Sequence, residues 1–370
     1  MSLRTCLRWL AALLLLVSVV GCSGANSSGD AGGGSGTKRF IFITNGDDPF
    51  WDAAYAGLKE GDKAFKCADA GIKVVMEKGT GKADGQINKL RQYASQPDIA
   101  GIAISVIQAD NAAIVDEMKK LQKKGVKIIT VDGDVNLEQF PDARPYYIGT
   151  NNMVAGKVAG QAAKELLEAR GVKEGGYVQF AGFTDNDNAR ARMNGVKEGM
   201  GGAYTEKDRM ADVMDLSRAR DNVRQAISKH NDLVALIGIW AYNAPAIAEV
   251  VEEKKVRDKT SIVTFDAQGV AIEHFAEGRI DAMVVQNPFD MGYQSVRLLK
   301  AMHEGDEAVI KEMFPNQGQP GGDVYTTGLR LVLPDEGSPI KADGYDSTIV
   351  EVMPLTKFRE WLKQYNLTSS

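Results

Sequence analysis

Two aspartates stand at the ends of two apolar, β-branched runs of the chain. Residues 128–131 (Ile-Ile-Thr-Val) lead into Asp132, and residues 262–265 (Ile-Val-Thr-Phe) lead into Asp266. About the length of one α/β lobe separates the two runs. Open parallel sheets bind ligands beyond the carboxyl ends of their strands, so the repeat predicts two similar lobes that each direct an acid into a shared crevice. Two carboxylates there can bind hydroxyl groups, and they can also carry out acid–base chemistry.

A second group of candidate ligand-binding residues follows the first expected strand. Asp48 could accept hydrogen bonds from hydroxyl groups, and the adjacent rings of Phe50 and Trp51 could stack on the apolar C–H face of a sugar. The alternative is structural: Asp48 would cap the following helix, and the rings would cover its end. The motif alone leaves both interpretations open.

The elements that must position these residues alternate between strand-like and helix-like patterns. Such alternation is typical of parallel sheets with crossover helices. In the first half we expect strands at 40–44, 72–77, 100–104 and 127–131, and helices at 51–66, 83–95 and 110–124. The second half repeats the plan, with strands at 177–181, 209–214, 234–239, 261–265 and 280–286 and helices at 151–170, 189–200, 217–230, 243–255, 271–277 and 291–302. A late strand at 327–333 and a short helix at 355–365 complete an α/β chain.

Length and composition limit the function classes. The 370 residues are 44% hydrophobic and 25% charged, which fits two globular domains. The formal net charge of −5 argues against a nucleic-acid partner, because no basic field is available to neutralise phosphates. The glycine-rich turn at 79–85 matches no nucleotide-binding fingerprint, and the three histidines lack metal-ligand spacing. We therefore expect no cofactor and no metal.

The N-terminal segment has the pattern of an export signal. Arginines give residues 1–21 a basic start, and an apolar run at 10–20 follows. The end of this segment resembles a bacterial lipobox, which would make Cys22 the acylated first residue of the mature protein; the alternative is an ordinary secretory peptide with an incidental cysteine. Residues 22–37 are rich in glycine and serine and predict a flexible tether. We expect a protein that is lipid-anchored to a membrane, in the periplasm or cell envelope.

Five motifs in one order resemble the type I periplasmic sugar-binding proteins, the family of the ribose-binding proteins. The motifs are a Pro-Phe-aromatic mouth at 49–51, a strand ending in Asp132, a helix opening at 188–195 (Asn-Ala-Arg-Ala-Arg-Met-Asn-Gly), a strand ending in Asp266, and Val-Gln-Asn-Pro at 285–288. The resemblance extends from about residue 38 to about residue 333.

The resemblance implies a fold and its domain boundaries. The expected fold has two Rossmann-like lobes, each a parallel sheet flanked by helices, joined by a three-segment hinge as in periplasmic binding proteins of type I. The N-terminal lobe would comprise residues 38–149 plus about 287–322. The C-terminal lobe would comprise residues 150–286 plus about 323–370.

The resemblance also implies which residues line the pocket. The matching positions are Asp48, Phe50, Trp51, Asp132, Arg190, Asp266 and Gln286. Arg190 can donate hydrogen bonds in a fork and Gln286 can both donate and accept them, as sugar hydroxyls require. The alternatives are that Arg190 is a solvated helix residue paired with an acid, and that Gln286 is a hinge or surface amide.

The chain departs from the ribose-binding pattern at two places. Ribose binders carry an arginine directly after the first-lobe aspartate, whereas this chain has Gly133. They also offer an asparagine after the third strand of the second lobe, where this chain reads Ile-Trp-Ala-Tyr-Asn at 239–243. Trp240 could supply a second stacking face, or it could pack on a helix, and Asn243 could substitute as the polar contact. These differences predict a sugar other than ribose.

The function implied is that of an extracytoplasmic solute-binding protein. It would capture a monosaccharide or similar polyol between its lobes by hinge closure, and deliver it as a monomer to the membrane permease of an ABC transporter. One alternative is a sensor that presents its ligand to a chemoreceptor or kinase. The other is a glycoside hydrolase with Asp132 and Asp266 as its carboxylate pair, a role poorly suited to acids on two mobile lobes. We therefore expect a binding protein and not an enzyme.

Overall fold

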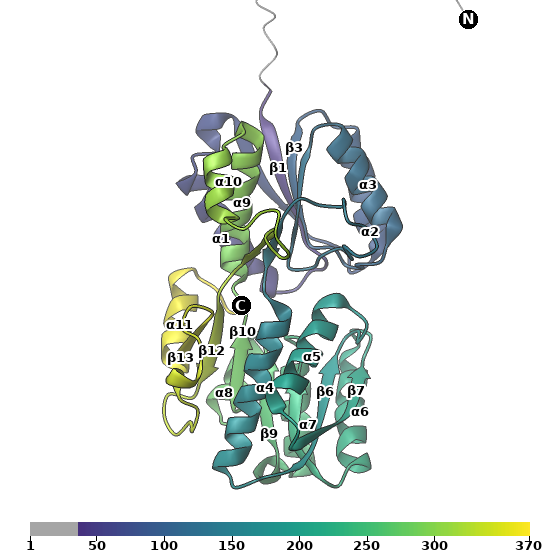
Figure 1. Cartoon of the computed structure of the whole chain (residues 1–370). Helices are drawn as coiled ribbons and strands as arrows, with labels where there is room; N and C mark the ends of the chain where they lie inside the picture. Colours follow the sequence, from purple (N-terminus) through teal and green to yellow (C-terminus); the bar gives the residue numbers. More distant parts are fainter. Residues whose placement is uncertain (1–35) are drawn as a thin grey trace, which may run out of the picture. The chain divides into compact units, whose positions relative to one another are not determined.

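The computed structural model describes residues 36–370 of the chain. The predicted signal peptide, the predicted lipidation site at Cys22 and most of the predicted tether lie outside the described residues. Within the described part, the strands form two sheets, and helices cover both faces of each (Figure 1). None of the helices in residues 36–370 combines the length and the apolar character that a bilayer-spanning segment needs. The predicted α/β class with two sheets is confirmed.

The first lobe is built on six parallel strands in the order β11-β5-β4-β3-β1-β2. Its strands are β1 (Lys38–Ile43), β2 (Ile72–Glu77), β3 (Ile99–Ile104), β4 (Lys127–Val131), β5 (Tyr147–Gly149) and β11 (Val324–Thr326). Its helices are α1 (Phe50–Ala64), η1 (Ala68–Ala70), α2 (Ala83–Ala94), α3 (Ala112–Lys123), α9 (Pro288–Glu304) and α10 (Glu307–Met313).

The second lobe has seven strands in the order β13-β12-β10-β9-β8-β6-β7, with one antiparallel pair, β10 and β12. Its strands are β6 (Gly175–Ala181), β7 (Tyr204–Ala211), β8 (Leu233–Gly238), β9 (Ser261–Phe265), β10 (Ala282–Val285), β12 (Leu329–Leu333) and β13 (Val350–Pro354). Its helices are α4 (Asn152–Ala169), α5 (Asp187–Met200), α6 (Leu216–Lys229), α7 (Asn243–Lys254), η2 (Arg257–Lys259), α8 (Gly269–Ala276), η3 (Ala342–Gly344) and α11 (Leu355–Gln364).

Apolar side chains bury both faces of the first sheet. In β1, Phe40 and Phe42 belong to the cluster that contains residues of α1 and α9, whereas Ile41 and Ile43 belong to the cluster with α2 and α3. Successive strand residues point to opposite faces, so a sheet covered on both faces requires continuous apolar runs. The runs that lead into Asp132 and Asp266 fit this requirement, because they are apolar except for one buried threonine each.

Three short segments connect the two sheets. They follow β5, β10 and β11 and lead into α4, α9 and β12, respectively. The first and third segments touch, because the Thr327 amide donates to the Gly149 carbonyl at 2.8 Å. Strand β11 pairs with β5 in the first sheet, whereas the sequence assigned residues from about 323 onward to the second lobe. Three residues of strand carry no hydrophobic period, so only their pairing shows that β11 belongs to the first sheet.

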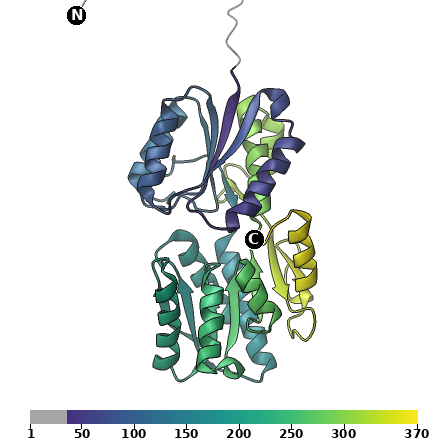
Figure 2. The ribbon, with the colours of Figure 1, turned by 180° about the vertical axis from the view of Figure 1, so that it is seen from behind.

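The last residues of the chain contact both lobes. Ser370 exchanges two backbone hydrogen bonds with Ala267, which follows Asp266, and Ser369 Oγ donates to the Pro49 carbonyl at 3.0 Å. Both serines are 2% exposed. The C-terminal end therefore lies beside the loops that carry Asp48 and Asp266 (Figure 2).

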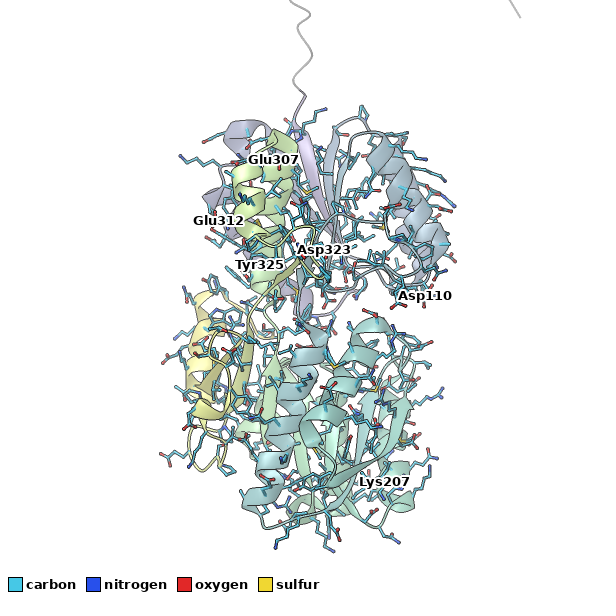
Figure 3. All side chains as sticks on the ribbon, viewed as in Figure 1. Asp110, Lys207, Glu307, Glu312, Asp323 and Tyr325 are labelled. Atoms are coloured by element: carbon cyan, nitrogen blue, oxygen red, sulfur yellow. The ribbon has the colours of Figure 1, made fainter. Side chains whose placement is uncertain are left out.

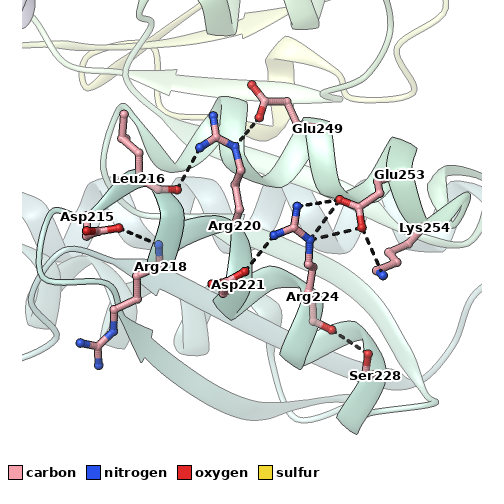
Figure 4. A network of polar contacts seen from close by, with 10 residues as sticks. All are labelled: Asp215, Leu216, Arg218, Arg220, Asp221, Arg224, Ser228, Glu249, Glu253 and Lys254. Carbon is pink, nitrogen blue, oxygen red and sulfur yellow. Dashed lines mark hydrogen bonds and ion pairs between the residues drawn. The ribbon is translucent and has the colours of Figure 1, made fainter.

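The outer helices α6 and α7 of the second lobe are joined by surface ion pairs (Figure 4). Arg220 contacts Glu249 at 2.6 Å, and Arg224 contacts both Glu253 and Asp221 at 2.8 Å. Exposed pairs of this kind contribute little to stability. They do neutralise the arginine-rich face of α6, which agrees with the absence of a basic field in the composition.

Candidate ligand-binding site

A cavity of about 140 Å³ lies between the carboxyl ends of strands from both sheets. Seven of the nine predicted pocket residues line it: Asp48, Phe50, Trp51, Asp132, Trp240, Asp266 and Gln286. Arg190 and Asn243 do not. The two strand-ending aspartates therefore do meet at one crevice, one from each lobe.

Asp132 and Asp266 have matching backbone conformations. Each follows its strand in the left-handed region, with φ of 60° for Asp132 and 58° for Asp266. Residues other than glycine rarely adopt this conformation, and such positions cluster at ligand sites. Each amide still donates to a neighbouring chain segment, Asp132 to the Ile148 carbonyl at 3.1 Å and Asp266 to the Val284 carbonyl at 2.8 Å. The left-handed turn thus ends each strand while keeping the aspartate fixed at the cavity.

Arg192, on α5, is the cation that lines this cavity. Its side chain is 2% exposed, and Nη1 lies 3.7 Å from Asp266 Oδ2. Nε donates to Asn152 Oδ1 at 2.9 Å and Nη1 donates to the Ile239 carbonyl at 3.1 Å, which leaves Nη2 buried without a partner among the described residues. Helix α5 lies against α4 at a glycine, since a Cβ on Gly156 would come within 2.1 Å of the Arg192 carbonyl. Close helix packing therefore holds Arg192 in place with one donor free.

The prediction that Arg190 lines the pocket is wrong. Arg190 is half-exposed and pairs with Asp187 at 2.9 Å on the surface of α5, as the alternative interpretation held. An α-helix has 3.6 residues per turn, so residues two apart point to nearly opposite sides. Ala189, Arg192, Met193 and Val196 form the buried side of α5.

Asn243 supports the site without lining it. Its Nδ2 donates to Asp212 Oδ2 at 2.9 Å, and its Oδ1 accepts from the Trp240 amide at 3.0 Å. Trp240 in turn donates through Nε1 to Asn188 Oδ1 at 3.0 Å. The side chain of Asn243, which the sequence predicts as a polar sugar contact, instead holds the Trp240 loop and does not line the cavity.

Gln286 lies beside Asp266 in the buried part of the cavity. We call the polar residues there, Asp132, Asp266, Arg192 and Gln286, the floor of the cavity. Gln286 Nε2 donates to both carboxylate oxygens of Asp266, at 3.1 and 3.0 Å, and its backbone amide donates to the same group at 3.3 Å. Gln286 Oε1 is buried and accepts no hydrogen bond within residues 36–370. The floor therefore presents a free acceptor at Gln286 beside a free donor at Arg192.

Asp48, Phe50 and Trp51 both line the cavity and cap or cover the start of α1, so the ligand-binding and the structural interpretation of this motif both apply. Asp48 Oδ1 accepts from the Phe50 amide at 2.9 Å, which is a cap-like contact at the start of α1. Its Oδ2 accepts from Gln268 Nε2 of the second lobe at 3.1 Å. Phe50 and Trp51 pack edge to face, with ring centroids 4.9 Å apart, and both line the cavity.

The sequence missed part of the second-lobe wall. These residues follow β6, β7 and β8, the same strand-end position that identified the aspartates: Phe183, Asn186, Asn188, Met214 and Tyr242. Phe183 and Tyr242 flank Trp240, at centroid distances of 6.1 and 6.4 Å. Asn188 and Tyr242 do lie in the motifs at 188–195 and 239–243, but no pattern marks their side chains, or those of Phe183, Asn186 and Met214, as pocket residues.

The two strand-ending aspartates have pKa values above the ordinary value of a carboxyl group. Burial raises the pKa of Asp132 from 3.8 to about 6, with Arg192 opposing the shift and the charge of Asp266 adding to it. Burial also raises the pKa of Asp266, against the opposing effects of Arg192 and of the hydrogen bonds from Gln286. Hydroxyl groups of a ligand could donate further hydrogen bonds to these carboxylates and so favour their charged forms.

The shift at Asp132 predicts a pH-dependent stability. Folded Asp132 keeps its proton to higher pH than unfolded Asp132, so its stabilising contribution is complete below about pH 4 and lost as the pH rises through about 6. Between these limits, the free energy of unfolding of Asp132→Asn should rise relative to that of the parent protein by up to about 3 kcal/mol. Urea unfolding of both proteins from pH 4 to 7 measures the difference. Parallel pH profiles would contradict the assigned shift.

Comparisons with known proteins agree with the two-lobed architecture. A family model described as periplasmic binding protein domain matches residues 39–307. The D-allose-binding periplasmic protein of Escherichia coli (strain K12) is 22% identical over 274 residues, which cover 72% of this chain and 85% of that protein.

Two solved structures share the fold. An ABC transporter solute-binding protein from Burkholderia graminis C4D1M, in complex with D-arabinose, has a TM-score of 0.69 at 24% identity, covering 81% of this chain and 96% of that one. GanP, a glucose-galactose binding protein from Geobacillus stearothermophilus, has a TM-score of 0.66 at 23% identity, covering 80% and 97%. The family model spans most of the chain, and the structure has two β-sheets, flanked by helices, with a cavity between their strand ends. This chain therefore belongs to the periplasmic binding protein family.

Proposed function

We propose that the protein captures a monosaccharide or similar polyol between its lobes and delivers it to an ABC-type sugar permease. The observation that carries the proposal is the buried floor of the cavity, where Asp132, Asp266, Arg192 and Gln286 offer acceptors and one free donor. Adjacent sugar hydroxyls both donate and accept, so they match carboxylates beside a guanidinium group. The sugars named for the Escherichia coli relative and the structural neighbours support the same ligand class.

Specificity follows from the groups that remain unpaired. A sugar lacking the hydroxyl that meets Arg192 Nη2 or Gln286 Oε1 leaves that group buried without a partner, at a cost of about 1–3 kcal/mol each. An arginine at position 133, as in ribose binders, would not fit here. A Cβ on Gly133 would come within 2.4 Å of the Val106 carbonyl. We therefore expect the preferred sugar to be one whose hydroxyl groups can be bound with Arg192 as the arginine of the cavity and without a second arginine at position 133.

The free energy of sugar binding would favour closure of the lobes. The cavity is lined from both sheets, so a sugar gains its full set of contacts only when the lobes are together. A ligand shifts a conformational equilibrium by its difference in affinity for the two states. Contacts such as that between Gln268 and Asp48 add to the closed state without touching the floor.

A thermal-shift screen over monosaccharides and small polyols tests the proposal. D-allose, D-arabinose, D-glucose and D-galactose belong in the panel. A compound at 100 times its Kd adds about 2.7 kcal/mol to the free energy of unfolding, which raises Tm by several degrees for a protein of this size. A folded protein whose Tm responds to no sugar or polyol would contradict the proposal.

We further propose that the protein is not an enzyme. The two carboxylates of a glycoside hydrolase need distinct roles, one a protonated acid and the other a nucleophile or base. Here burial raises the pKa of both aspartates and Arg192 faces both. Incubation with a panel of glycosides tests this point: turnover that disappears in Asp132→Asn would overturn it.

We also propose that the protein works as a monomer, lipid-anchored through Cys22 in the periplasm or cell envelope. Cys22→Ala should release it from membranes into the soluble fraction, as judged by sedimentation of cell lysates. Cys67→Ala is the matched control, because Cys67 is buried in the first lobe and should not affect anchoring. A Cys22→Ala protein that still sediments with membranes would refute the anchor.

A further inference from the structure

Arg144 holds two carboxylates from separate parts of the first lobe. It lies in the loop between β4 and β5, and its side chain is 2% exposed. Nε donates to Asp134 Oδ1 at 3.1 Å and Nη2 donates to Asp134 Oδ2 at 2.6 Å, while Nη1 donates to Asp323. The planar guanidinium group can serve both partners at once, which a lysine ammonium group cannot do with the same geometry.

The Asp134 side of this contact fixes the loop that carries Asp132. Asp134 Oδ1 also accepts from Thr130 Oγ1 at 2.6 Å, so the turn around Asp132 is tied to its own strand. Arg144 also lies over the ring of Tyr147, 5.7 Å from its centroid, and the Tyr147 hydroxyl donates to the Asp132 carbonyl at 3.0 Å. Arg144 therefore supports the backbone of a cavity aspartate without reaching the cavity.

The Asp323 side of the contact leads to the hinge. Asp323 directly precedes β11, and its carbonyl accepts from the Tyr147 amide at 2.9 Å. After β11 the chain crosses to the second lobe, and there Thr327 donates to Gly149, where the first crossing begins. Figure 3 labels Asp323 and Tyr325 on this segment.

We propose that Arg144 is a positioning residue that couples the Asp132 loop to the crossing segments of the hinge. The inference rests on the proposed function, since it concerns how sugar capture and lobe movement are linked. Asp323 stands next to β11, on the first-lobe side of the third crossing, so a hinge movement that displaced β11 from β5 would take a partner from Arg144, whose side chain is buried. The contact therefore favours one hinge geometry together with one geometry of the Asp132 loop. Such coupling is reciprocal, so sugar bound at Asp132 would stabilise that hinge geometry.

The test replaces Asp323 with asparagine, which keeps the size of the side chain and leaves the Asp134 fork and every cavity residue intact. The probes are D-allose, D-arabinose, D-glucose and D-galactose, extended to any other sugar found in the screen. For each probe that the parent protein binds, we expect Asp323→Asn to bind about tenfold more weakly, mainly through faster dissociation. Stopped-flow fluorescence can follow this step, since Trp51 and Trp240 line the cavity from opposite lobes.

The control is Glu312→Gln, which removes another ion pair of the first lobe. Glu312 contacts Arg297 at 2.6 Å and is labelled on α10 in Figure 3. It should bind the probes as the parent does. Asp323→Glu, which keeps the charge, should recover most of the affinity. In an Arg144→Lys background, Asp323→Asn should cause no further loss, because the two changes break the same link.

The outcomes separate the two proposals. If the parent binds a probe and Asp323→Asn binds it equally well, the coupling is refuted and the proposed function stands. If Asp323→Glu loses as much affinity as Asp323→Asn, the role is structural and the coupling is likewise refuted. If the parent binds no sugar or polyol at all, the proposed function fails and the inference fails with it.

Discussion

Replacing Arg192 with alanine should abolish sugar binding, with a loss of at least about 1000-fold in affinity measured by calorimetry. Arg192 carries the free donor of the cavity floor, and its Nη1 lies 3.7 Å from Asp266. Its removal takes away the donor and leaves two neighbouring carboxylates without their common cation. Loss of the opposite charge disfavours the ionised form of a buried carboxyl group and raises its pKa further. The sugar hydroxyls would therefore meet carboxyl groups that are more often protonated and accept hydrogen bonds less well.

Arg190→Ala is the matched control for this experiment. It removes the same side chain from the same helix, two residues away, where Arg190 pairs with Asp187 at the surface. Its affinity should equal that of the parent protein. Arg192→Lys should retain the charge but lose the fork, and should bind at an intermediate level. Equal losses in Arg190→Ala and Arg192→Ala would show that α5 presents a different side to the sugar.

The pair of strand-ending aspartates could be predicted because buried parallel strands leave a strong signal. A strand covered on both faces must be apolar throughout, and the first polar residue after it lies at the edge where ligands bind. Residues 128–131 and 262–265 are apolar apart from one buried threonine each, and Asp132 and Asp266 follow them directly at the cavity. The same rule applies to Phe183 and Tyr242, but a residue at a strand end is recognised as a ligand-binding candidate only when its chemistry is conspicuous.

The choice of arginine on α5 failed for a different reason. Motif order alone matched the helix to the family, and two arginines stand two residues apart in that motif. The periodicity of the helix would have separated them, because Arg192 shares the side of Ala189, Met193 and Val196. The spacing of the apolar residues on α5, and not the motif, indicates which of the two arginines faces the cavity.

The hinge could be predicted only in outline. Strands β5 and β11 have three residues each, too short to show a period of two, and only pairing identifies them, that of β5 with β4 and β11 and that of β11 with β5. Arg144, in the loop before β5, is separated from Asp323 by 179 positions in the sequence. No local pattern joins such residues, since the contact depends on the tertiary arrangement of the crossing segments.

Replacing Asp266 with alanine should weaken sugar binding by at least about 100-fold, as two hydrogen bonds to a charged group are lost at about 1.5–3 kcal/mol each. The same change should not lower the stability of the sugar-free protein at neutral pH by a comparable amount. Burial raises the pKa of Asp266 despite the hydrogen bonds from Gln286, so its charge is less favourable in the folded protein than in the unfolded chain. Calorimetry gives the affinity and urea unfolding gives the stability.

Asp281→Ala is the control, because we expect it to lower the stability and leave the affinity for sugar unchanged. Asp281 directly precedes β10, near the opposite end of the same strands, where it accepts from the Ile262 amide at 2.7 Å and pairs with Arg257 at 2.6 Å. Its loss should reduce the free energy of unfolding, because it leaves a backbone donor and an arginine without their partner, while affinity stays at the parent level. An Asp266→Ala protein that loses stability but retains affinity would place Asp266 with Asp281 among the structural acids. Opposite responses of the two variants would instead mark Asp266 as a carboxylate that is kept for its ligand at the expense of the fold.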